Sequence, residues 1–203
     1  MASSMTLIDI ANLAAVELGE APISSFEDNT SFARAMKIIH IPIRDKFLRE
    51  NNWNSATARV TLAASTDTPK WGFSTSYPLP ADWLKLLEVR SQATNVYIDS
   101  TNVPNNIPYR LEGDDIICNE TTGVQIRYVK RLTDVSRWDS MMVEALATLY
   151  AYKTAYTITK DAGLRAQLKA EYEQYVVKAG LADGFDDTVE DIPTDSWITV
   201  RQS

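Results

Sequence analysis

Few side chains of this sequence could carry out covalent or metal chemistry. His40 is its only histidine and Cys118 its only cysteine. A metal site or a proton relay built from several histidines is therefore excluded within this sequence, and a cysteine–histidine dyad would need these two residues side by side. Cys118 follows Ile116 and Ile117 in a run typical of a buried strand, so we interpret it as a small core residue. We interpret His40 as a surface or packing residue.

Carboxylates are the other candidates for chemistry. Adjacent pairs occur at Asp114 and Asp115 and at Asp186 and Asp187. A glycosidase needs two carboxyl groups that face each other across a cleft, which neighbours in sequence do not establish. Gly113 before the first pair predicts a hairpin turn instead. The seven glycines form neither a P-loop nor a GxGxxG motif. We therefore predict no catalytic residue, no metal ligand and no cofactor, and we expect the protein not to be an enzyme.

Two groups of basic residues could contact phosphates or acidic partners. The first lies within residues 34–49, where acidic residues are interspersed. The second surrounds the last predicted strand and its exit, and its members are Arg127, Lys130, Arg131 and Arg137. Solvated faces and ion pairs between subunits are the ordinary interpretation, and contact with DNA is the alternative. We assign the second group to a DNA channel or to a contact between subunits.

Length and composition are those of a globular protein. The 203 residues are 45% hydrophobic and 23% charged, which suits one domain or two small ones. No apolar run reaches the roughly 18 residues that a membrane span needs, and no signal peptide is visible at the N-terminus. The single cysteine excludes disulfides within the chain and indicates assembly in a reducing cytoplasm. We expect no membrane partner.

The charge is negative and uneven. The net charge of −7 argues against a protein that wraps DNA tightly, although an acidic wall would let DNA slide past. Residues 183–203 contain six acids and one base. This segment also has too few apolar residues to form a core of its own. We therefore predict an acidic C-terminal arm that becomes ordered on a partner.

Apolar spacing predicts four helices, near residues 6–18, 30–52, 138–154 and 161–181. Thr6 and Asp9 resemble a capping box. Pro42 predicts a kink or break in the second helix. The apolar stripe that we expect the second helix to bury consists of Ala35, Ile38, Ile39, Ile43, Phe47 and Leu48. The fourth helix has a stripe of Leu164, Leu168, Tyr172, Tyr175 and Val176.

Between the second and third helices, short β-type runs alternate with turns. The predicted strands are Arg59–Ala63, Leu84–Arg90, Val96–Asp99, Tyr109–Leu111, Ile116–Asn119 and Val124–Lys130. The predicted fold class is α+β: a four-helix bundle with an antiparallel β region inserted between helices 2 and 3, plus an extended C-terminal tail. The predicted domains are a helical domain of residues 1–55 and 132–184, an inserted β domain of residues 56–131, and the acidic arm of residues 185–203.

An ordered series of short motifs resembles a known family. It begins with Asn12–Ile23 and Ser25–Asp28 and continues with Arg44–Leu48, Trp53–Asn54, Tyr77–Asp82, Ile126–Arg131, Thr133–Asp134 and Glu144–Ala147. In order and spacing this series resembles tail tubular protein A, the head-to-tail adaptor of short-tailed phages (podoviruses). The likeness spans about residues 8–180. Pro42 departs from the family pattern, whose second helix usually continues through that point.

The resemblance implies a structural role in the virion neck or tail, with assembly in the host cytoplasm. Such adaptors form a ring, usually a dodecamer, between the portal protein and the tail nozzle, which is a tail tubular protein B-like protein. The ring retains packaged double-stranded DNA and conducts it during ejection, and tail fibres are a further expected partner. In related adaptors the C-terminal segment reaches the portal, so we assign portal binding to Phe185, Ile192, Trp197 and Ile198. The alternatives are a virion-associated glycan or cell-wall hydrolase and another connector of the tail or capsid.

Overall fold

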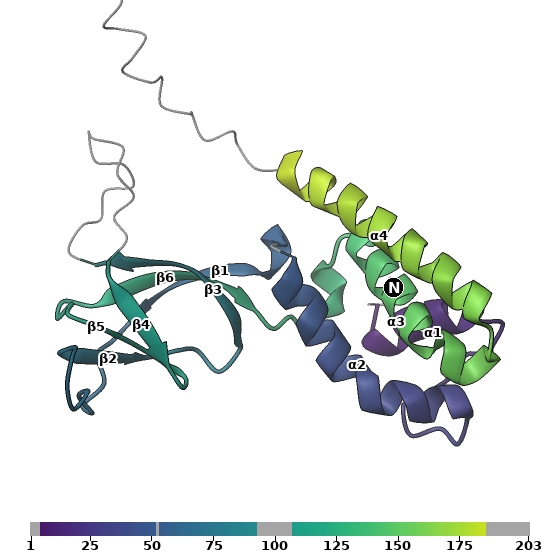
Figure 1. Cartoon of the computed structure of the whole chain (residues 1–203), viewed down its shortest axis with the longest axis horizontal. Helices are drawn as coiled ribbons and strands as arrows, with labels where there is room; N and C mark the ends of the chain where they lie inside the picture. Colours follow the sequence, from purple (N-terminus) through teal and green to yellow (C-terminus); the bar gives the residue numbers. More distant parts are fainter. Residues whose placement is uncertain (1–4, 52, 93–106, 186–203) are drawn as a thin grey trace, which may run out of the picture. The chain divides into compact units, whose positions relative to one another are not determined.

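The computed structural model describes residues 5–51, 53–92 and 107–185, and it contains α-helices and β-strands in an α+β arrangement (Figure 1). The chain divides into two compact units. The helical unit takes in Met1–Ala58, Ala81–Leu86 and Tyr128–Gly184, and the β unit includes Arg59–Pro80 and Leu87–Arg127. Each unit is described by itself below. No helix in the described ranges combines the length and the apolar character needed to cross a bilayer.

The helical unit is built around α3 (Ser140–Thr159), against which α1 (Leu7–Glu17) and α2 (Ser31–Glu50) pack. Helix α3 buries residues on every side, among them Leu146, Leu149 and Tyr150, as its continuous apolar character predicts. The Tyr150 hydroxyl donates a hydrogen bond of 2.8 Å to the carbonyl oxygen of His40 on α2. Burial raises the pKa of Tyr150, so this donor stays protonated.

The start of α1 follows its sequence signal. Thr6 is the N-cap, and its side chain and that of Asp9 form the predicted capping box. After α1, Gly19 adopts a positive φ of 71° that ends the helix. The side-chain amide of Asn12 then receives one hydrogen bond from Ile23 N–H and donates one to the Ile23 carbonyl oxygen, at 2.8 and 3.0 Å. These two bonds fix the connection between α1 and α2.

Helix α2 corrects two predictions. It is helical without interruption from Ser31 to Glu50, so a break at Pro42 is wrong, whereas the ribbon of α2 changes direction along its length, in agreement with the alternative of a kink (Figure 1). Its buried face is Phe32, Ala33, Met36, Arg44, Phe47 and Leu48, and Ile38 lies on the exposed face instead of in the buried stripe. The buried face includes the charged residue Arg44. A search for apolar residues alone does not identify such a position as buried.

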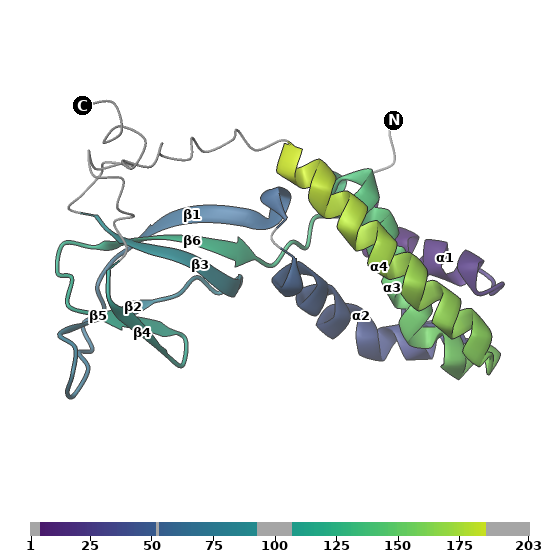
Figure 2. The same cartoon turned by 45° about the horizontal axis from the view of Figure 1, so that its top comes forward.

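Helix α4 (Ala162–Phe185) runs alongside α3 in both cartoon views (Figures 1 and 2). The two helices are joined at Lys160, which adopts a left-handed conformation with a φ of 58°. Of the predicted apolar stripe on α4, Leu168 is buried and the other members are half-buried. The helix extends past the predicted end near residue 181 and continues to Phe185.

The strands form two three-stranded sheets (Figures 1 and 2). The first has the order β1 (Thr57–Leu62), β6 (Val124–Lys130), β3 (Trp83–Ser91), and the second has the order β2 (Thr75–Pro78), β5 (Asp115–Cys118), β4 (Tyr109–Glu112). Strands β4 and β5 form the hairpin that Gly113 predicted: Glu112 pairs with Asp115 and Gly113 has a φ of 62°. Cys118 is buried on β5, as predicted.

Strand β2 was not among the predicted strands. The strand ends at Pro78 and lies at the edge of its sheet, a position that tolerates proline. Its partner is β5, with Thr75 opposite Cys118 and Tyr77 opposite Ile116. The predicted strand Val96–Asp99 lies outside the described residues.

The predicted fold class is wrong in its architecture. The structure is α+β with four α-helices and two three-stranded antiparallel sheets, and along the chain the helices flank the sheets. It is not a four-helix bundle with one inserted β region. The physical reason lies in α4, whose stripe is mostly half-buried, so that α4 covers the surface of α3 rather than completing a bundle. Residues Ala81–Leu86, from the middle of the β region, also group with the helices.

Candidate functional site

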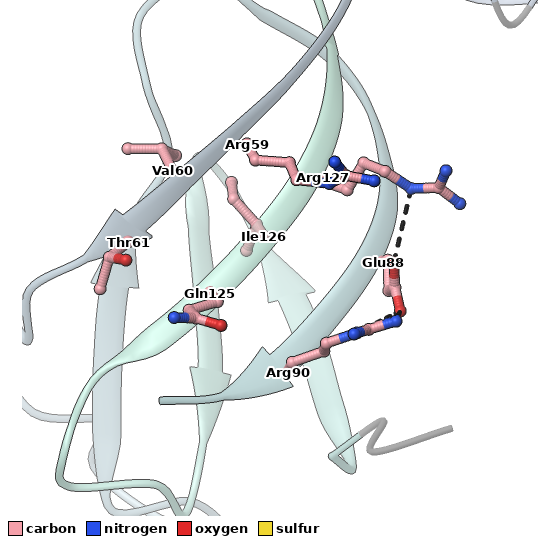
Figure 3. Close-up of a pocket in the computed structure, with 8 residues that line it drawn as sticks. All are labelled: Arg59, Val60, Thr61, Glu88, Arg90, Gln125, Ile126 and Arg127. Carbon is pink, nitrogen blue, oxygen red and sulfur yellow. Dashed lines mark hydrogen bonds and ion pairs between the residues drawn. The ribbon is translucent and has the colours of Figure 1, made fainter. Parts of the chain in front are cut away.

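One face of the β1–β6–β3 sheet gathers polar and charged side chains around a shallow pocket of about 320 Å³ (Figure 3). Side chains two residues apart on a strand point to the same face. The pocket therefore receives alternate residues from three strands: Arg59 and Thr61 from β1, Gln125 and Arg127 from β6, and Glu88 and Arg90 from β3. Val60 and Ile126 complete its lining.

Glu88 is the centre of this face. Figure 3 shows its carboxylate between the guanidinium groups of Arg90 and Arg127, and Arg90 forms an ion pair with it. The Nε atom of Arg127 lies 3.4 Å from Oε2 of Glu88 but makes no hydrogen bond within the described structure. One carboxylate is thus shared by two arginines, and Arg59 brings the pocket to three positive charges against one negative.

This composition suits an anion better than hydrolytic chemistry. Guanidinium groups bind carboxylates and phosphates through paired N–H donors. Glycoside hydrolysis needs two carboxyl groups across a cleft, whereas Glu88 is the single carboxylate in the lining of this pocket. The part of the chain that the structure describes contains no cluster of three or more histidine, cysteine, aspartate or glutamate residues that could hold a metal ion.

The four basic residues assigned to a DNA channel or subunit contact are divided between the two units. Arg127 lines the pocket of the β unit, while Lys130, Arg131 and Arg137 belong to the helical unit. Arg131 Nε donates a hydrogen bond of 2.8 Å to Oδ2 of Asp45. Arg137 ends a short 3-10 helix, Val135–Arg137, before α3. Their assignment to DNA or to a neighbouring subunit stays a prediction.

Of the residues assigned to portal binding, Phe185 is the last residue of α4. Ile192, Trp197 and Ile198 lie outside the described residues. Their role therefore stays a prediction.

A polar network in the helical unit connects α2 with the exit of β6 and the start of β3. Asp45 accepts hydrogen bonds from the buried Arg44 through Oδ1 and from Arg131 through Oδ2. Asp82 accepts a hydrogen bond of 3.1 Å from the Tyr128 hydroxyl, and its carbonyl oxygen accepts one of 2.6 Å from the Arg131 N–H. Burial, and then the nearby Asp82 carboxylate, raise the pKa of Tyr128 to about 12, so the hydroxyl remains a donor at neutral pH.

Two helices of the same unit expose apolar side chains, a feature that the sequence did not reveal. On α1, Leu13 is 42% and Val16 is 71% exposed, and on α2, Ile38 is 75% and Ile41 is 50% exposed. Each pair is spaced by three residues and so lies on one helix face. Single exposed apolar residues are ordinary, but neighbouring ones on a face indicate a contact surface. The sequence did not indicate this exposure, because the spacing of Ile38 also fits the apolar stripe that was expected to be buried.

Glu17, next to Val16 on α1, gives a testable pH effect. Burial raises the pKa of Glu17 above its usual 4.5, a hydrogen bond from Thr148 partly opposes this, and Glu171 and Glu144 raise it further. A carboxyl group with a raised pKa in the folded state makes the fold less stable as pH rises through the range above 4.5. Glu17→Gln keeps an acceptor for Thr148 and removes the charge.

We therefore expect Glu17→Gln to raise the free energy of unfolding at pH 7 by up to about 1 kcal/mol, allowing for solvent screening. The gain should disappear near pH 4, where both proteins are neutral at this position. Thermal or urea unfolding at several pH values measures it. Glu173→Gln, on the exposed surface of α4, is the control and should change stability by less than about 0.5 kcal/mol. A loss of stability in Glu17→Gln at pH 7 would contradict the assignment.

Comparison with known proteins identified no family and no curated relative. The sequence matches no protein-family model, and no curated protein matches it.

Proposed function

We propose that this protein is a structural component of a phage virion, a head-to-tail adaptor that forms a ring between the portal and the tail nozzle. The proposal starts from the resemblance of the motif series to tail tubular protein A. In this role the ring retains packaged double-stranded DNA and conducts it during ejection. The portal, the nozzle and the sister copies are its protein partners, and tail fibres are a further candidate. It acts through binding, without chemistry on a substrate.

The observation that carries the proposal is where the motif residues lie. Asn12 fixes the α1–α2 connection through Ile23, and Asp82 holds Tyr128 and the backbone of Arg131. Asp45 joins α2 to Arg131. These three polar residues of the series thus connect segments of the chain to one another. Such positions are those a family of structural proteins would share.

The exposed apolar residues of α1 and α2 provide further support. A subunit whose folded surface retains neighbouring apolar side chains gains free energy when that surface meets another protein. The hydrolase alternative has less support, because the pocket of the β unit offers one carboxylate that two arginines already hold. Another tail or capsid connector would share the same surfaces and differs in its location in the particle.

The C-terminal arm gives a direct test of portal binding. We expect a variant without residues 185–203 to retain its helical circular dichroism and its unfolding transition, because the described cores lie before this segment. Its affinity for a purified portal ring should fall at least about tenfold, since anchors such as Trp197 are lost. A variant with the order of residues 186–203 scrambled keeps the net charge and serves as the control. Normal docking of the truncated protein would contradict the role of the arm.

A further inference from the structure

The exposed side of α1 is apolar in the middle and acidic at both ends. It consists of Asp9, Leu13, Val16 and Glu17, here called the α1 face, in which Asp9 and Leu13, Leu13 and Val16, and Leu13 and Glu17 are three or four residues apart and so lie on one side of the helix. No basic residue occurs between Thr6 and Glu20. Glu17 is further surrounded by the carboxylates of Glu144 on α3 and Glu171 on α4, which both act on it electrostatically. The field at this face is therefore negative.

The exposed side of α2 includes a face that is basic at its N-terminal end and apolar beyond it. Its residues are Arg34, Lys37, Ile38 and Ile41, here called the α2 face. Lys37 forms an exposed ion pair with Glu27, and Arg34 donates a hydrogen bond of 3.2 Å to Asn29. Exposed pairs of this kind contribute at most about 1 kcal/mol. They can therefore be exchanged for contacts with a neighbouring chain at little cost.

We infer that neighbouring copies of this chain meet with the α1 face of one copy against the α2 face of the next. This inference rests on the proposed function, in which the protein forms a ring, and it names the surfaces that build the ring. Leu13 and Val16 of one copy would meet Ile38 and Ile41 of the other, with an acidic end of the α1 face opposite Arg34 and Lys37 of the α2 face. An apolar centre with a charged rim is the usual anatomy of a protein interface.

Charge determines which pairing is favoured. Two α1 faces would place acids against acids and two α2 faces bases against bases, and like charges across an interface cost several kcal/mol. The complementary pairing is heterologous, because each copy uses a different face toward each neighbour. After one contact forms, both end copies still have an unused face. Assembly can therefore continue, and it ends in a closed ring when the rotation between neighbouring copies divides a full turn evenly, which is the geometry an adaptor ring requires.

Cysteine cross-linking tests this geometry. Cys118, the single native cysteine, is buried, so the unmodified chain should give no product with a short bis-maleimide reagent. Val16→Cys alone and Ile38→Cys alone should also stay monomeric, because neither face meets itself. An equal mixture of the two variants should give a dimer and nothing larger. The double variant Val16→Cys with Ile38→Cys should give a ladder of oligomers on a denaturing gel.

A matched pair of additional substitutions checks that the contact is specific. Ile41→Arg, added to the double variant, should remove most of the ladder because it places a charge in the apolar centre. Val177→Arg, an exposed apolar position on α4, should leave the ladder unchanged. Reversing charge by Glu17→Lys or by Lys37→Glu should weaken cross-linking, and combining both should restore it. Circular dichroism and the melting transition confirm that each variant is folded.

The outcomes separate this inference from the proposed function. Dimers from either single cysteine variant, or no ladder from the folded double variant at millimolar concentration, would overturn the α1–α2 contact. If the ladder is absent but the protein still occupies the neck of the particle as a ring, the function stands and the contact is wrong. If the ladder forms but the protein lies elsewhere in the particle, the contact stands and the function is wrong.

Discussion

Replacement of Asp45 by alanine is expected to lower the free energy of unfolding by about 3–5 kcal/mol, the usual cost of leaving a buried charge without its partner. Both Nε and Nη2 of Arg44 donate to Oδ1 of Asp45, at 3.0 and 2.7 Å, and the Arg44 side chain is 5% exposed. Arg131 donates to the other oxygen at 2.8 Å. Removing the carboxylate leaves the Arg44 charge buried and unpaired and separates α2 from the exit of β6.

Urea unfolding, followed by circular dichroism, measures this effect. Glu27→Ala is the matched control because it also breaks a carboxylate ion pair, but between the exposed side chains of Glu27 and Lys37. Its cost should be at most about 1 kcal/mol. Asp45→Asn keeps one acceptor oxygen and should fall between the two. If Asp45→Ala costs less than about 1 kcal/mol, the network does not hold the helical unit together.

The second large effect is expected for Phe47→Ala. Phe47 is fully buried, and its ring lies 5.1 Å from the ring of Trp53 and 6.5 Å from that of Trp138, measured between centroids. Neither indole N–H has a hydrogen-bond partner within the described structure, so packing is what holds these rings. Truncating a buried phenylalanine costs about 3–5 kcal/mol through lost burial and the cavity left behind.

Thermal unfolding and tryptophan fluorescence report on this cluster together. For a chain of this size 3–5 kcal/mol corresponds to a fall in Tm of roughly 6–20 °C, and the emission of the native state should shift as Trp53 and Trp138 lose a neighbour. Tyr156→Ala removes an exposed aromatic ring from α3 and should change stability by less than about 0.5 kcal/mol. An unchanged Tm and emission spectrum in Phe47→Ala would show that the cluster is not part of the core.

Local features of the fold could be predicted from the sequence because local chemistry determines them. The capping box at Thr6 and Asp9 and the turn at Gly113 depend on a few adjacent residues, and both were correct. The orientation of α2 was predicted only in part: Phe47 and Leu48 are buried as expected, but the burial of Arg44, which pairs with Asp45, could not be predicted from a charged residue. Ile38 was therefore assigned to the core although it is exposed.

Features that depend on contacts between residues far apart in the sequence could not be predicted in the same way. The order β1–β6–β3 pairs segments far apart in the chain, and no short motif specifies it. The polar pocket follows from that order, because Glu88 and Arg127 become neighbours only when β3 lies beside β6. Arg127 was singled out in advance, but Glu88, with which it forms an ion pair, and Arg90, which pairs with the same carboxylate, were not. The two helix faces likewise emerged only when burial separated exposed from core residues.

Electron cryomicroscopy of the phage particles in which the proposal places this chain tests the account most directly. Fitting the helical unit into the map locates every copy without assuming a role. A closed ring of copies at the junction of capsid and tail, in contact with the portal above and the nozzle below, is the predicted result. Absence of the chain from that junction, or its presence there as isolated single copies, would contradict the proposal that this protein is a ring-forming connector.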